Sequence, residues 1–204
     1  MKNSNLVFAP TFNKFRENPK WLVNMLLVII IAIASAWITT LTTDISAELK
    51  ETGLSEADVA NMSTFTTVFA YIGAVIGAIV GVAFMFLLIL IVSKIMKSDV
   101  KATSLFAAAT FMTLITSIYG LIIVAIHAIM DLDPVKYSFT SLKIFNQSNQ
   151  FLGIFDLKIL LGAYLFGVVL YATSHLKGKS ALIWAIVYLV LLIGLGLIQA
   201  SIAL

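Results

Sequence analysis

Residues 65–92 read FTTVFAYIGAVIGAIVGVAFMFLLILIV, a run of 28 residues without a single charged side chain. An α-helix rises 1.5 Å per residue, so about 20 apolar residues cross a hydrocarbon core of about 30 Å. Within lipid, the backbone polar groups must be satisfied inside the segment itself, which leaves a helix as the structure of such a run. The run therefore predicts a membrane-spanning helix that is long enough to tilt or to extend beyond the bilayer.

Four further apolar blocks surround this one, and short polar gaps separate them. Together the five predicted spans are Leu22–Thr43, Phe65–Val92, Leu105–Met130, Leu157–Ser174 and Ala181–Leu204. Hydrophobic residues make up 61% of the 204 residues and charged residues 11%, a composition typical of integral membrane proteins. The sequence predicts an all-α fold, a polytopic membrane bundle of five transmembrane helices over residues 21–204, preceded by a cytoplasmic segment over residues 1–20.

The positions of the basic residues predict the orientation. Nine of the thirteen basic residues fall on one side of a five-span arrangement, namely Lys2, Lys14, Arg16, Lys20, Lys94, Lys97, Lys101, Lys177 and Lys179. By the positive-inside rule, that side is cytoplasmic. The N-terminus is therefore expected inside and the C-terminus outside, and the cytoplasmic membrane of a bacterium is the expected location.

Local signals mark the ends of the first two spans. Gly53 is typical of a helix stop, and Ser55 followed by Asp58 is typical of a helix start with an acid in its first turn. These signals predict a helical hairpin that projects beyond the membrane. In the N-terminal segment, Phe8, Phe12 and Phe15 recur at helical spacing beside basic residues. Two interpretations stay open for this segment: a helix lying in the cytoplasmic membrane interface, or a plain lead-in to the first span.

Small residues form a ladder on the second span. Gly73, Gly77 and Gly81 recur every four residues and therefore stack on one helix face, where another helix could approach closely, within the chain or between chains. Gly167 belongs to a shorter ladder in the fourth span, and Gly194 and Gly196 lie in the fifth. The second, fourth and fifth spans are therefore expected to form the tight inner packing of the bundle.

Few polar residues fall within the spans, and none forms a known catalytic pattern. The candidate functional polar residues are Asn24 in the first span, Tyr119 and His127 in the third, and Asp156 at the start of the fourth, with Gln199 near the chain end. Asp156 and Lys158 are expected within one turn of the outer interface, where Asp156 would cap the helix and Lys158 would extend towards water. No cysteine is present, and no catalytic or phosphate-binding motif occurs. We expect no catalytic residue, cofactor, metal or nucleic-acid partner, and no enzymatic activity.

The sequence resembles bacterial members of the Yip (Ypt/Rab-interacting protein) superfamily. The resemblance rests on NPKWLVNMLLVII (residues 18–30) entering the first span, on Phe155-Asp156 opening the fourth, on the short basic fourth gap, and on a fifth span that ends the chain. Lys158 and Leu161 stand where relatives usually carry an apolar residue and a tryptophan. The N-terminal segment is shorter than in the eukaryotic members that work with small GTPases, so GTPase binding is not carried over.

The resemblance implies a compact membrane protein that acts as a non-enzymatic adaptor, membrane organiser or receptor-like partner. Its partners would be the lipid bilayer and other membrane proteins or copies of itself. The alternative is a small-molecule or lipid transporter with a cavity between spans two, four and five. Transport predicts a deep polar cavity lined by Asn24, Tyr119 or Gln199, whereas the other roles predict none.

Overall fold

The chain folds almost entirely into helices. The structure, a computed structural model, describes residues 5–43, 50, 55–132 and 138–202. The helices in this part of the chain are α1 (Ala9–Glu17), α2 (Leu22–Thr42), α4 (Glu56–Ile95), α5 (Ala102–Ile129), the 3₁₀ helices η1 (Leu142–Phe145) and η2 (Gln150–Ile154), α6 (Leu157–Ala172) and α7 (Gly178–Ile202). The predicted all-helical fold is confirmed, and the five long helices begin and end close to the predicted spans, except that α4 begins earlier.

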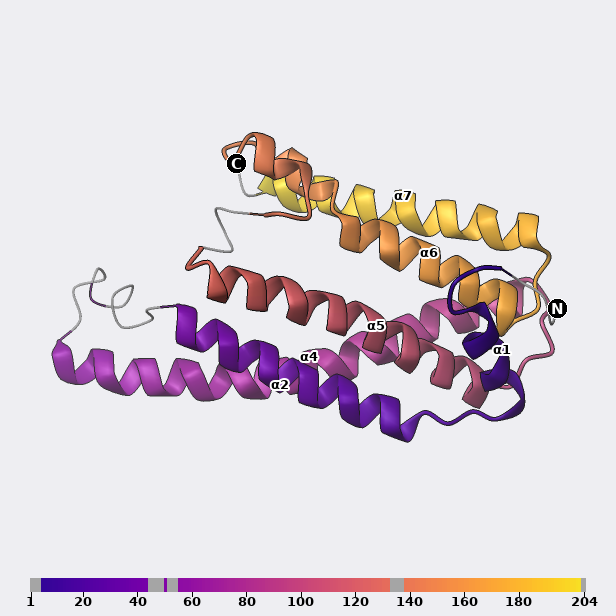
Figure 1. Cartoon of the computed structure of the whole chain (residues 1–204), viewed down its shortest axis with the longest axis horizontal. Helices are drawn as coiled ribbons and strands as arrows, with labels where there is room; N and C mark the ends of the chain where they lie inside the picture. The colour runs from indigo at the N-terminus through magenta and orange to yellow at the C-terminus, as the bar shows by residue number, and fades with distance from the viewer. Residues whose placement is uncertain (1–4, 44–49, 51–54, 133–137, 203–204) are drawn as a thin grey trace.

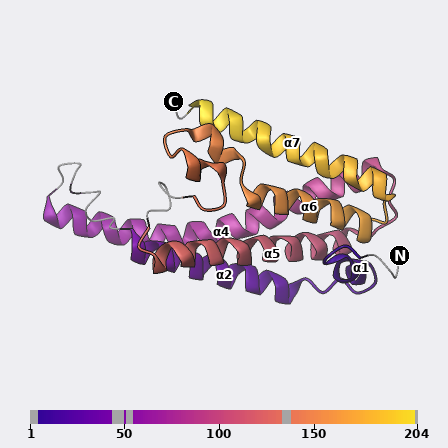
Figure 2. The same cartoon turned by 45° about the horizontal axis from the view of Figure 1, so that its top comes forward.

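The long helices form two layers (Figures 1 and 2). Helices α2, α4 and α5 contact one another in the first layer, and α6 pairs with α7 in the second. Contacts between α5 and α6 join the layers, and α1 covers the end of the bundle where α4 ends and α5 and α7 begin. Lys94, Lys101, Lys177 and Lys179 gather at this end, which we call the lysine-rich end.

Four of the long helices are long and apolar enough to cross a membrane: α2, α4, α5 and α7. The fifth, α6, is equally apolar but has only 16 residues. It would span about 24 Å, less than a hydrocarbon core of about 30 Å. Helix α6 begins at Leu157 because Asp156 caps its first turn, and the residues before it form a loop with two 3₁₀ helices.

Helix α4 has 40 residues, about twice the length that a bilayer requires. Its first turn confirms the start signal in the sequence: the Ser55 side chain accepts a hydrogen bond from the Asp58 backbone N–H, and Glu56 and Asp58 lie in the first turn. Gly53, the expected stop of the preceding segment, lies outside the described residues. The residues before the second predicted span thus continue the same helix, and its projection beyond the membrane stays a prediction.

Helix α1 follows the aromatic pattern that the sequence showed, but its aromatic face contacts protein. Pro10 lies in its first turn, and the helix ends before Pro19, as expected from the fixed backbone of proline. Phe12 has no exposed surface, and its ring lies 5.3 Å from that of Phe111 on α5. An amphipathic helix buries the same face against lipid or against other helices, and here the bundle takes the place of the membrane interface.

Polar contacts also attach α1 to the bundle. The Arg16 guanidinium donates to the carbonyl of Thr173 at 3.0 Å and to the Asp99 carboxylate, and the Thr173 hydroxyl donates to the Phe12 carbonyl at 2.9 Å. The Arg16 side chain lowers the pKa of Asp99, and burial together with Arg16 lowers the pKa of His175. Each lowered pKa means that the folded protein favours the deprotonated form of Asp99 and of His175. Protonation of these groups in acid therefore weakens the attachment of α1.

The central helix is α5, contrary to the expected packing of spans two, four and five. It contacts α1, α2, α4 and α6, whereas α4 contacts α5 and α2 far more extensively than α6. Four consecutive side chains of α5 have no exposed surface: Ala107, Ala108, Ala109 and Thr110. This alanine run lets three neighbouring helices approach α5 closely. The sequence analysis predicted close packing from the glycines of the other spans and did not identify this run.

The arrangement predicts which loops lie on the same side of the membrane. Reporter fusions after Met96 and after Gly178 should both behave as cytoplasmic, and a fusion after Asn149 should behave as external, because α6 runs between the two ends. The same response after Asn149 and Gly178 would show that α6 does not cross the membrane and would contradict the five-span topology.

Candidate functional site

Asp156 joins the last long loop to the start of α6. Its Oδ1 accepts the backbone N–H of Lys158 at 2.7 Å, and its Oδ2 accepts the hydroxyl of Thr140 at 2.9 Å. The backbone N–H of Leu157 donates to the Thr140 carbonyl at 2.9 Å, and Ser141 forms an isolated antiparallel bridge with Asp156. Asp156 is therefore both the predicted cap of α6 and a clasp that closes the loop onto it.

The loop itself contains two short 3₁₀ helices. Ser141 caps η1 by accepting from the Lys143 N–H, and Asn149 caps η2 by accepting from the Phe151 N–H. Helix η2 packs on α7, where Ile154 lies so close to Gly196 that a Cβ on Gly196 would come within 2.9 Å of the isoleucine. The loop, which joins α5 to α6, is thus packed against α7.

This packing sets Asp156 back from the end of α5. The Tyr119 hydroxyl lies near Thr140 and Asp156, and Tyr119 precedes the end of α5 by about 15 Å of helix. Figure 1 shows the same offset, with α6 beginning well inside the ends of α5 and α7. The expectation that Asp156 and Lys158 lie within one turn of the outer interface stays a prediction, and α6 begins at Leu157, where the fourth span was expected to start.

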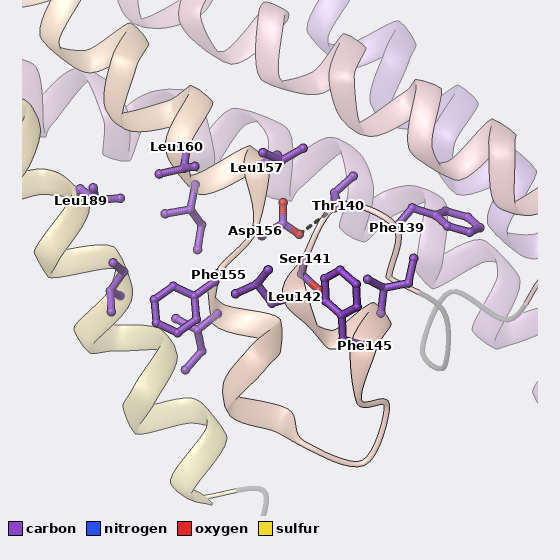
Figure 3. Close-up of a pocket in the computed structure, with 14 residues that line it drawn as sticks. Phe139, Thr140, Ser141, Leu142, Phe145, Phe155, Asp156, Leu157, Leu160 and Leu189 are labelled. Atoms are coloured by element: carbon purple, nitrogen blue, oxygen red, sulfur yellow. Dashed lines mark hydrogen bonds between the residues drawn. The ribbon is translucent and has the colours of Figure 1, made fainter.

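An apolar groove of about 600 Å³ lies beside Asp156, between the loop and helices α6 and α7 (Figure 3). Its lining is mostly aliphatic and aromatic, with Thr140, Ser141 and Asp156 as its polar members. The lining residues are Phe139, Thr140, Ser141, Leu142, Ile144, Phe145, Ile154, Phe155, Asp156, Leu157, Ile159, Leu160, Leu189 and Ile193. Phe145, Phe155 and Leu160 are more than half exposed, so the groove opens to the surroundings of the bundle.

Only some of the predicted polar residues come together. Tyr119 and Asp156 lie near each other, and the Tyr119 hydroxyl is buried without a hydrogen bond to any described residue. His127 is buried, its Nδ1 lies 2.8 Å from the Ile123 carbonyl, and its ring contacts Phe139 at 4.7 Å. Asn24 lies in the first turn of α2, near the lysine-rich end, 3.5 Å from the Lys20 carbonyl, and Gln199 is exposed on α7. Asn24 and Gln199 therefore take no part in the site.

Thr140 and Ser141 are the site residues that the sequence analysis missed. They pair with Phe155–Leu157 across a loop, and no local pattern reveals such a pairing. Within the described residues, no group of three or more His, Cys, Asp or Glu side chains could hold a metal ion. The chemistry available at the groove is thus apolar contact beside a carboxylate whose two oxygens already accept hydrogen bonds.

The glycines that were expected to mark close helix contacts behave differently from one another. A Cβ on Gly167 would lie 2.9 Å from the Cβ of Ala185, so α6 and α7 are in close approach there. At Gly73, Gly77 and Gly81, by contrast, a Cβ would meet no described atom within 4 Å. Within the chain, the α4 ladder therefore faces open space, and its role as a contact between chains stays a prediction.

A matched pair of substitutions tests this difference. Gly167→Ala should destabilise the protein by about 1–3 kcal/mol, because the added methyl group overpacks the α6–α7 contact. Gly77→Ala should leave the melting temperature unchanged or raise it slightly, because it adds helix propensity in open space. Thermal unfolding in detergent measures both, and equal losses from the two variants would contradict the assignment.

Asp156 is expected to be a structural cap. Asp156→Asn keeps an acceptor for the Lys158 N–H and a polar group for Thr140, whereas Asp156→Ala loses both. The alanine variant should therefore lose about 1 kcal/mol of stability and the asparagine variant much less. If Asp156→Asn melts normally but abolishes activity in cells, the carboxylate carries a proton or an ion, and the cap alone does not explain it.

Comparison with known proteins gives a family. The Yip1 domain model matches residues 4–199. This range covers every helix from α1 to α6, the loop before α6, and nearly all of α7. No curated protein and no solved structure matches the chain. The apolar helices and the extent of this match lead to one conclusion: the chain is an integral membrane protein and belongs to the Yip1 domain family.

Proposed function

We propose that the chain is a non-enzymatic membrane organiser that binds lipid acyl chains in the groove beside Asp156. In this proposal it crosses a bacterial cytoplasmic membrane five times, with the N-terminus inside and the C-terminus outside. The charge distribution supports the orientation, since Lys94, Lys101, Lys177 and Lys179 gather at one end of the bundle. Other membrane proteins, or further copies of the chain, would be gathered through the lipids it holds and through its exposed helices.

The observation that carries the proposal is the chemical character of the groove. Its volume of about 600 Å³ lies within the range of ligand pockets, and side chains of carbon and hydrogen dominate its wall. Phe145, Phe155 and Leu160 remain exposed at the groove and would face the bilayer. In such surroundings the molecules present at the highest concentration are phospholipids, whose acyl chains match an apolar wall.

The hydrogen bonds of Asp156 also support an apolar ligand. Both of its carboxylate oxygens accept hydrogen bonds from the loop and from α6, at 2.9 and 2.7 Å. A carboxylate engaged in this way is well placed to hold the loop, and fewer of its lone pairs remain for a cation. The groove therefore has a fixed polar wall at one end and free apolar surface over the rest.

A photoactivatable phospholipid with a diazirine in its acyl chain tests the proposal. In nanodiscs, the label should concentrate on residues 139–145 and 154–160 relative to equally exposed positions on α2. Leu160→Trp, which fills the groove, should reduce this labelling several-fold, and Val190→Trp, on the exposed face of α7, should not. Uniform labelling over all lipid-facing helices, or no effect of Leu160→Trp, would refute a lipid-binding groove.

A further inference from the structure

A second and chemically different cavity lies on the other side of α6. It is a crevice of about 400 Å³ between α2, α4 and α5, and Lys158 of α6 closes one side of it. A smaller cavity of about 200 Å³ shares Thr113, Thr116 and Lys158 with it and reaches α7 at Tyr188 and Leu192. We call the larger cavity the lysine crevice.

The walls of the lysine crevice leave room for a ligand. Gly77, Ala78, Gly81 and Gly120 line it, and a Cβ on any of the three glycines would meet no described atom within 4 Å. A water molecule takes about 30 Å³, so the space exceeds that of one or two ordered waters. The crevice also stays open, because Lys158 is exposed. The small residues of α4 and α5 thus border a space that neighbouring side chains do not fill.

Residues that carry hydrogen-bond donors line this space. Besides Lys158, they are Ser35, Thr113, Thr116 and Ser117. Thr116 donates to the carbonyls of Met112 and Thr113, but in the described part of the chain the hydroxyls of Ser35, Thr113 and Ser117 make no hydrogen bond. No carboxylate lines the crevice, and Asp156, two residues away, is engaged by Thr140 and by the Lys158 backbone.

The position of Lys158 makes this arrangement costly without a counter-charge. Thr113 and Thr116, beside it, lie about three to four turns, or 17–21 Å, from the lysine-rich end of α5. Gly77 and Gly81 lie about 20–25 Å from Lys94 along α4, which gives the same depth. In the proposed five-span arrangement the crevice would lie within the hydrocarbon core of about 30 Å, where charged groups normally pair with a partner or with a ligand.

We propose that the lysine crevice binds a phosphate-bearing anion, the phosphate group of a phospholipid drawn in between the two helix layers. The ammonium group of Lys158 pairs with the phosphate, and the hydroxyls of Ser35, Thr113 and Ser117 donate to its oxygens. Phospholipids are the most abundant carriers of such an anion around the bundle, and binding would draw a headgroup inward from the interface. The site is separate from the apolar groove, so either can exist without the other.

Native mass spectrometry of the detergent-solubilised full chain tests the proposal, with phosphatidylglycerol as the probe. We expect one tightly held lipid, and we expect Lys158→Met to weaken its binding by about tenfold or more, as for loss of a charge-assisted contact. Lys158→Arg should restore it. Gly77→Leu keeps the charge but fills the crevice, and it should weaken binding as well. Lys143→Met, on the loop, and Lys94→Met, at the lysine-rich end, serve as charge controls.

Thermal unfolding of each variant without lipid shows whether the variants are folded. Unchanged binding of phosphatidylglycerol in both Lys158→Met and Gly77→Leu would refute the site. Inorganic phosphate provides the second arm: if it binds in a Lys158-dependent manner while the lipid does not, the lipid is the wrong source of the anion. Equal losses in the charge controls would show that the measured lipid binds to the general basic surface, and this would also refute the proposal.

Discussion

The structure depends on close packing of small side chains along the half of α5 that lies nearest the lysine-rich end. Between lipid and protein there is little hydrophobic driving force, so helices in a membrane associate through dispersion contacts that require close approach. Ala107, Ala108, Ala109 and Thr110 provide that approach on every side of the helix. The fully buried aromatic and aliphatic side chains near the lysine-rich end, Phe12, Leu105, Phe166 and Leu170 among them, pack around this segment.

The opposite half of the bundle is organised by a loop rather than by helices. Because α6 begins well inside the bundle, the two layers are held apart there by η1, η2 and the clasp at Asp156. The consequence is a pair of cavities on either side of the first turn of α6, one apolar and one rich in donors. The late start of α6 is therefore the feature that accompanies both cavities.

Local signals allowed much of this fold to be predicted. The spans follow from length and hydropathy, and the caps at Ser55 and Asp156 follow from residues within three positions of each helix start. Contacts between distant segments could not be predicted. The Phe8, Phe12 and Phe15 pattern defines an apolar helix face, but the same face suits lipid or protein, and a long-range contact with Phe111 decides between them. Likewise, glycines such as Gly77 permit close approach without specifying that a helix comes near, so the ladder predicted a contact where the structure has a crevice.

The continuous 40-residue helix α4 has a mechanical consequence. Its rise of 1.5 Å per residue gives about 60 Å, about twice the thickness of a hydrocarbon core. Helices answer a change in bilayer thickness by changing their tilt. With the helix held by α5 near Lys94, a 10° change in tilt would displace its first turn sideways by about 10 Å. Helix α4 would therefore act as a lever. A small change in membrane thickness would change its tilt, and the tilt would displace its first turn by a much larger distance.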